Sequence, residues 1–186
     1  MSDLTITNAG VSVAANSAGS SISTGRRKVI RLTPVLATSA YADGDVLFNA
    51  IEIPNAVKEI GGCSKLISMY IYSQIGSTID ATFIFSENSL TLGTQKATAN
   101  AGDSTFEAAN LTGMIFLDGS AAQTTHIDNS RFFASCYSTS NAGVSNEPQL
   151  LQAASNSTSA YVSAIITAGT PTFQADSVDL ILHIEY

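Results

Sequence analysis

The residues best placed to do chemistry together are His126 and Asp128, an imidazole and a carboxylate two positions apart. On a β-strand such side chains point to the same side, so with a third ligand they could hold a metal ion. No third ligand is identifiable in the sequence. His183 lies on the polar side of an alternating segment, where a histidine that faces solvent is the simpler interpretation. We therefore predict neither a metal site nor a catalytic role for the two histidines.

The two cysteines give no sign of a zinc or redox motif. Cys63 and Cys136 lie far apart, and neither belongs to a CxxC pair. Cys136 with His126 as its base would make a nucleophile, but Cys136 lies in the apolar run 132–137, which is typical of a hydrophobic core. We expect both thiols to be buried.

Two acidic residues, Asp43 and Asp45, resemble part of a calcium loop in the segment Tyr41-Ala-Asp-Gly-Asp-Val. A full EF-hand loop needs more oxygen ligands and a glutamate at a fixed offset, so a tight turn through Asp43 and Gly44 explains them better. The chain holds no GxxxxGK[ST] or GxSxG motif, and no GxGxxG that follows a predicted strand. We therefore predict a protein that is not an enzyme and binds no cofactor.

The composition excludes further function classes. The 186 residues include 8 Lys and Arg against 15 Asp and Glu, so only 12% are charged, against about 25% in an ordinary soluble domain. The net charge of −7 argues against a nucleic-acid binder, whose phosphate contacts need basic residues. No run approaches the roughly 18 apolar residues that span a bilayer, and residues 1–25 lack the pattern of a secretory signal. We expect synthesis in a cytoplasm and no membrane contact.

The chain divides at about residue 26. Of residues 1–25, eighteen are Ser, Thr, Gly, Ala or Asn, and Asp3 carries the only charge, so this segment cannot hold itself folded. We predict an extended N-terminal arm over 1–25, disordered alone or ordered on a partner, and a β-sandwich domain over 26–186. A terminus without any role is the alternative.

A basic cluster marks the boundary between arm and domain. Arg26, Arg27, Lys28 and Arg31 are four of the eight basic residues, whereas residues 32–186 carry four basic and 14 acidic groups. One interpretation is that the cluster docks on an acidic partner surface. The other is that its charges lie in solvent at the start of a strand and discourage pairing with another chain. The docking interpretation predicts that a chain without residues 1–31 folds but does not bind its partner.

Short strand-like runs separated by turn residues occupy the domain. The clearest lies at 178–186, where apolar and polar residues alternate with a period of two. The others lie at 28–36, 46–53, 65–72, 79–85, 113–117, 131–137 and 160–167. This pattern predicts an all-β antiparallel sandwich or barrel. The one helix expected covers 103–109, with a capping box from Ser104 to Glu107, inside a long connection over 86–110.

Two of the predicted strands are apolar on both faces, the runs at 65–72 and 79–85. In the first, Leu66, Tyr70 and Tyr72 share one parity, and we predict that they form an interface face opposite Ile67, Met69 and Ile71. A loop of the same chain or another subunit would cover such a face.

The stretch Tyr41-Ala-Asp-Gly-Asp-Val-Leu-Phe, followed by Ile53-Pro-Asn-Ala-Val, the Gly61-Gly62 turn and the strand at 65–72, resembles a group of structural proteins of tailed bacteriophages. The run at 83–86, the turn at 168–173 and the closing strand at 178–184 look like that group too, so the similarity spans about residues 29–186.

The resemblance implies a virion component with a β-sandwich of jelly-roll type that serves as a capsid decoration (cement) protein. Its partners would be the major capsid protein and further copies of itself, as a trimer or dimer, on the capsid surface. A tail, neck or fibre-associated protein is an alternative, and so is a carbohydrate-binding sandwich, which the absence of Trp weakens.

Overall fold

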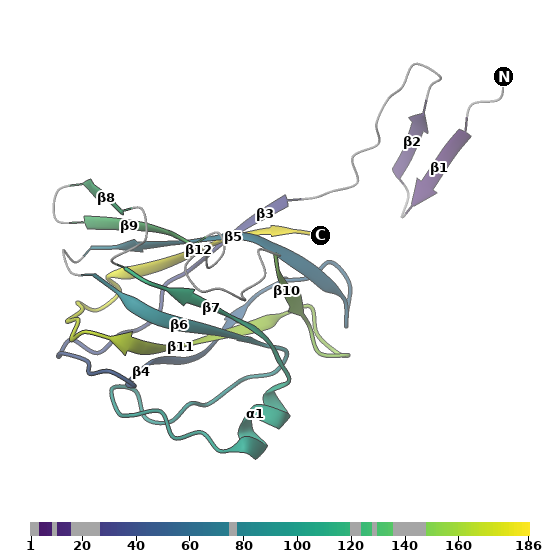
Figure 1. Cartoon of the computed structure of the whole chain (residues 1–186). Helices are drawn as coiled ribbons and strands as arrows, with labels where there is room; N and C mark the ends of the chain where they lie inside the picture. The colour runs from purple at the N-terminus through teal and green to yellow at the C-terminus, as the bar shows by residue number, and fades with distance from the viewer. Residues whose placement is uncertain are drawn as a thin grey trace, which may run out of the picture.

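Strands make up most of the chain wherever its structure is described. The computed structural model describes residues 27–74, 78–119 and 148–186 in full, and only the backbone of 4–8, 11–15, 124–127 and 130–135. The elements in chain order are β1 (Leu4–Asn8), β2 (Val11–Ala15), β3 (Arg27–Leu32), β4 (Val46–Ile53), β5 (Cys63–Ser73), β6 (Asp80–Ser86), α1 (Asp103–Ala109), β7 (Leu111–Leu117), β8 (Thr124–Ile127), β9 (Ser130–Ser135), β10 (Gln149–Gln152), β11 (Ala160–Ala168) and β12 (Val178–Glu185). Figure 1 shows the main strands in two layers.

The two layers are antiparallel sheets. The first has the order β3-β12-β5-β9-β8, and β10 pairs with the same edge of β5 as β9, further toward the start of that strand. The second has the order β4-β11-β6-β7. This arrangement confirms the predicted all-β antiparallel sandwich.

The strand pairing is nested along the chain. β3 pairs with β12, β4 with β11, β5 with β10 and β6 with β7, each pair antiparallel. One long double strand, folded over so that its four pairs alternate between two sheets, is the pattern of a jelly roll. The β8–β9 hairpin is an addition to this pattern between β7 and β10.

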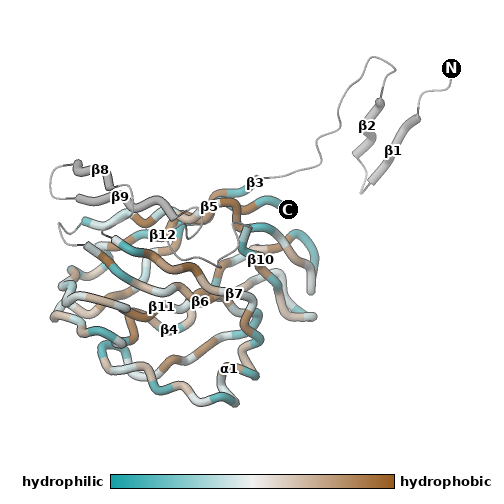
Figure 2. The backbone as a smooth tube through the Cα atoms, viewed as in Figure 1, coloured by the Kyte–Doolittle hydropathy of each residue, from teal (hydrophilic) through white to brown (hydrophobic). Residues whose placement is uncertain are grey.

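The core lies between the two sheets. β12 supplies Val178, Leu180, Leu182 and Ile184 to it, and its alternate residues are half-exposed, as its period of two predicted. From the second sheet the largest side chains are Phe48, Phe83 and Phe85, each at most 3% exposed. Figure 2 shows hydrophobic residues along β6 and β7, and hydrophilic residues on β3, near the C-terminus and in parts of the connections.

The long connection 87–110 covers the outer face of the second sheet. Leu90, Leu92 and Ala109 pack on Val46 and Ile84, and together they form a second apolar cluster. The second apolar face of β6 is therefore covered by a loop of the same chain, one of the two alternatives for it. The connection also lies along the free edge of β4, where the Val46 N–H donates to Ala97 O at 2.9 Å and the Ala50 N–H donates to Leu90 O at 3.0 Å.

The helix at Asp103–Ala109 has the predicted bounds, but its predicted capping box is wrong. The N-cap is Gly102, and no side chain caps the helix. Asn110 ends the helix in the left-handed conformation, with φ of 50°. Within the sandwich two strands were not predicted, β8 and β10, because four-residue segments carry too little periodicity to stand out.

The segment from Tyr41 to Val46 is a turn that joins several parts of the domain. The Asp45 carboxylate accepts a hydrogen bond from the Ala42 N–H at 2.8 Å, and Gly44 has φ of 82°, which favours glycine. The Tyr41 ring is 1% exposed and meets Phe173 edge-on, with centroids 5.4 Å apart. Its hydroxyl accepts a hydrogen bond from the Ala37 N–H at 2.8 Å. The segment therefore builds structure, as the predicted turn requires.

The described part of the N-terminal arm forms a two-stranded sheet, β1–β2, which the predicted arm did not include. Among the described residues no ladder joins this hairpin to the sandwich. β3 begins at Arg27 and is part of the sandwich, so the structure argues against the expectation that a chain without residues 1–31 keeps its fold. That truncation removes Ile30 and leaves Leu32 as the first residue of the chain. Both residues lie in the core. The strand ends before Pro34, which lacks an N–H to pair.

Candidate docking surface

The outer face of the first sheet brings together two groups of predicted site residues that lie far apart in the sequence. Arg31 of β3 has Ile181 of β12 as its Cα partner, and Ile181 has Tyr70 of β5 on its other side. One row further along, Asp179 is opposite Tyr72. We call this surface the docking face, and it consists of Arg27, Val29, Arg31, Tyr70, Tyr72, Asp179, Ile181, His183 and Glu185.

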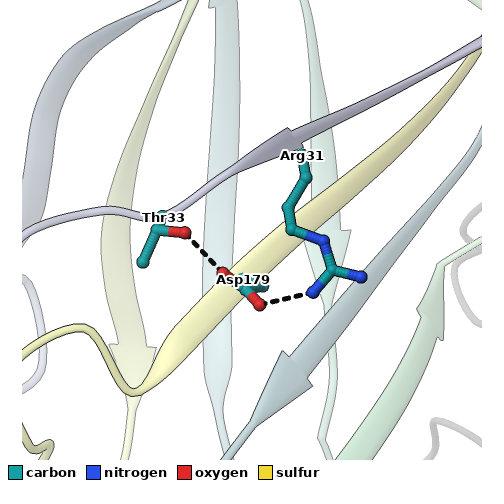
Figure 3. Close-up of polar contacts among 3 residues, drawn as sticks. All are labelled: Arg31, Thr33 and Asp179. Carbon is teal, nitrogen blue, oxygen red and sulfur yellow. Dashed lines mark hydrogen bonds and ion pairs between the residues drawn. The ribbon is translucent and has the colours of Figure 1, made fainter.

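The basic residues of the docking face pair with carboxylates of β12. Arg31 Nη1 lies 2.7 Å from Asp179 Oδ2, and Thr33 Oγ1 donates to Asp179 Oδ1 at 2.5 Å (Figure 3). Arg27 Nε lies 3.3 Å from Glu185 Oε1, and Lys28 Nζ donates to the Pro54 carbonyl at 3.4 Å. Arg26 lies outside the described residues. The two arginine side chains stay 78% and 60% exposed, so a partner would meet ion pairs rather than bare cations.

The aromatic part of the docking face is half-buried. The Tyr70 ring lies 5.1 Å from the His183 ring, centroid to centroid, with a tilt of 56° between their planes. Next to them Val29 of β3 is 62% exposed. Tyr and Arg are the residue types enriched where proteins bind one another, so the chemistry of this face suits a protein partner.

The assignment of Leu66 to the same face is wrong. Leu66 is 2% exposed and packs in the core with Met69 and Ile71. The cause is an irregularity in the register, because His183 pairs with Ser68 while the next residue, Ile184, pairs with Leu66. The extra residue, Ile67, reverses the alternation along β5.

A second apolar surface was not predicted. Leu111, Met114 and Phe116 of β7 and Leu150 of β10 are between 42% and 53% exposed, and β10 lies beside β7. Met114 and Phe116, whose Cα partners are Ile84 and Thr82 of β6, lie on the outer face of the second sheet, and we call these two residues the β7 patch. The run Met114-Ile115-Phe116-Leu117, which is apolar at both parities, is the signal that could have found it.

The residues considered for chemistry do not assemble into a site where the structure describes them. His126 lies in β8 opposite Arg131, and Asp128 is outside the described residues. No group of three or more His, Cys, Asp or Glu able to hold a metal occurs in the described part of the chain. Cys63 is exposed, so its predicted burial is wrong: it stands at the open start of β5. Cys136 is not among the described residues.

Neither a family model nor a curated protein matches this chain. Among the described helices, none has the length and apolar composition to cross a membrane.

Asp179 is expected to contribute more to stability than Glu185, although both pair with an arginine. The Asp179 side chain is 17% exposed and accepts from both Arg31 and Thr33, whereas the Glu185 side chain is 33% exposed and its arginine is 78% exposed. We expect Asp179→Ala to lower the free energy of unfolding by about 1 kcal/mol and Glu185→Ala by less than about 0.5 kcal/mol. Urea denaturation at low and high salt measures both; equal losses would contradict the ranking.

Proposed function

We propose that the protein is a non-enzymatic structural component of a virion, a decoration (cement) protein that binds and stabilises the shell of the major capsid protein. The observation that carries the proposal is the docking face, on which tyrosines, paired arginines and an exposed valine from three strands form one surface. Flat sheet faces of this kind bind broad partner surfaces rather than small molecules.

Two further features support the proposal. The jelly roll recurs among viral capsid proteins, although lectins and cupins share it, so the fold alone does not decide the function. The turn at 41–46, on which the resemblance to phage structural proteins largely depends, joins β4 to the loops at 95–99 and 171–173. The motif thus has a structural reason to recur in proteins of this fold.

The docking face also revises how the chain would hold the shell. The basic residues Arg27 and Arg31 contribute as members of ion pairs that lie beside Val29 and Tyr70, so apolar and aromatic contacts provide the binding. Lys28 shares the parity of the core residues Ile30 and Leu32, and its Nζ donates to the Pro54 carbonyl, so it is not part of that face. The partner is the major capsid protein, and the chain acts there as a trimer or dimer.

The test is the copy number of the chain in purified particles, measured by quantitative mass spectrometry against the major capsid protein. A ratio of about one to one, or about one to three, supports a shell protein, because symmetric assemblies bind in simple fractions. A few copies per particle would assign it to the tail, neck or fibre instead. Its absence from particles would overturn the virion proposal.

A matched pair of variants tests the docking face itself. Val29→Glu places a charge on the face, whereas Val35→Glu makes the same change in the loop after β3, at a residue 73% exposed. We expect the first to lower the occupancy of particles at least about tenfold and the second to leave it unchanged, since buried contacts at an interface carry most of its affinity. Equal occupancy for both variants would contradict the assignment of this face.

A further inference from the structure

The docking face continues beyond β5 onto β10. Leu150 of β10 has Lys65 of β5 as its Cα partner, and Lys65 has Glu185 of β12 on its other side. Residues paired in this way point to the same side of a sheet. Leu150 is 53% exposed, whereas Leu151, of the opposite parity, is fully buried. The outer face of the first sheet therefore includes Lys65 and Leu150.

One row of residues on this face crosses four strands. It consists of Arg27 of β3, Glu185 of β12, Lys65 of β5 and Leu150 of β10. Neighbouring strands lie about 4.8 Å apart, so the row is about 14 Å long. Val29, which is 62% exposed, lies two residues beyond Arg27 on the same side of β3. The face thus has an exposed aliphatic side chain near each end, with charged residues between them.

The row has two cations and only one carboxylate. The Glu185 carboxylate accepts a hydrogen bond from Arg27 Nε at 3.3 Å, and Arg31 on the next part of the face pairs with Asp179. Among the described residues no ion pair holds Lys65, which is exposed. Lys65, which lies outside the predicted basic cluster, is therefore the cation that remains available to an external carboxylate on the described part of this face.

A partner that covers this part of the face has to satisfy both residues. Burial of the Leu150 side chain is favourable against an apolar group, because removal of apolar surface from water drives association. Burial of the Lys65 ammonium without a counter-charge is unfavourable, because the charge loses its hydration. A carboxylate next to an apolar side chain meets both requirements.

We propose that Lys65 and Leu150 form a second contact site of the docking face, and that this site binds a carboxylate flanked by an apolar side chain on the protein partner. The inference rests on the proposed function, because it concerns the same face and the same partner. It moves the acidic group of the partner from the basic cluster at residues 26–31, where two arginines are already paired, to Lys65.

Two matched pairs of variants test the site on purified particles made without the chain. Lys65→Glu is compared with Lys96→Glu, at an exposed lysine beside the free edge of β4. Leu150→Glu is compared with Met114→Glu, at a residue 51% exposed on the outer face of the second sheet. We expect the first member of each pair to lower the occupancy of particles at least about tenfold and the second to leave it unchanged. Circular dichroism melting checks that each variant is folded.

Salt tests the carboxylate itself. Because salt screens the attraction between charges, occupancy by the full chain should fall as the salt concentration is raised from about 0.05 M to about 0.5 M. Lys65→Gln should remove most of that dependence. Equal salt dependence of the two chains would overturn the assignment of a carboxylate to the partner.

Chemical labelling tests the contact without any substitution. Acetylation of the full chain, located by mass spectrometry after digestion, should modify Lys65 and Lys96 in the free chain but only Lys96 on particles. Cys63 is exposed and shares the parity of Lys65 on β5, so its reaction with a maleimide should also be lost on particles.

The outcomes separate this site from the virion proposal. Equal occupancy of particles by Lys65→Glu, Leu150→Glu and the full chain would overturn the second contact site and leave the virion proposal standing. Acetylation of Lys65 on particles would do the same. A full chain that does not occupy particles would overturn both proposals.

Discussion

Removal of residues 1–31 is expected to unfold the sandwich, whereas removal of residues 1–26 is expected to leave its melting temperature within a few degrees of the full chain. The difference is β3, whose Ile30 and Leu32 are 6% and 7% exposed in the core and whose whole length pairs with β12. Loss of each buried aliphatic side chain costs about 2–5 kcal/mol, and a domain of this kind has only about 5–15 kcal/mol to lose.

Thermal melting followed by circular dichroism measures the effect. Ile30→Ala in the full chain is the intermediate case and should lower the free energy of unfolding by about 2–4 kcal/mol without abolishing the transition. A cooperative melt of the chain without residues 1–31 close to that of the full chain would show that β3 is dispensable.

Tyr41→Ala is expected to destabilise the domain by about 3–5 kcal/mol, the usual cost of removing a buried aromatic ring. The ring packs on Phe173, and its hydroxyl accepts from Ala37. Tyr41→Phe keeps the ring and leaves the Ala37 N–H without that acceptor, so we expect a loss of only about 1–2 kcal/mol. Urea denaturation of both variants measures the two losses, and equal losses would contradict the role assigned to the ring.

Alkali gives a second measurement on the same residue. Burial raises the pKa of Tyr41 above its ordinary value of 10.0, so the folded chain holds this proton at a pH where the unfolded chain has released it. The stability that this proton represents is present below about pH 10 and is lost as the pH rises through the raised pKa. Burial also raises the pKa of Tyr186, so Tyr41→Phe should reduce the loss above pH 10 without abolishing it.

The fold was predictable where the sequence alternates over many residues. The last strand was found because its alternation extends over eight residues, and the helix at Asp103–Ala109 was found because its pattern is longer than one helical turn. Leu66 was misplaced because a bulge at Ile67 is a property of the paired strands, and alternation along one strand does not show it. β10 is a strand because it pairs with β5, and the sequence of four residues alone does not predict that pairing.

The candidate site was predictable only in pieces. The basic cluster and the tyrosines at 70 and 72 are visible in the sequence, but it is the register of β12 between β3 and β5 that puts them on one face. The ion pairs of Arg27 and Arg31 depend on carboxylates about 150 residues away in the chain, which no local pattern connects to them. The β7 patch is exposed because the connection 87–110 packs on Val46 and Ile84 and leaves Met114 and Phe116 uncovered. This coverage depends on the tertiary structure and is not visible in the sequence.

The nested pairing sets the order in which a newly made chain is able to fold. β3 finds its partner only when β12 has left the ribosome, because the two strands are separated by nearly the whole domain. Pairings between such distant segments form slowly, since the loop that they close must be ordered first. The pair β6–β7, which is the closest in the chain among the four, has no such delay. The pair β6–β7 is therefore able to form early in synthesis, whereas β3, the strand that follows the arm, is fixed in the sandwich only when the final strand is complete.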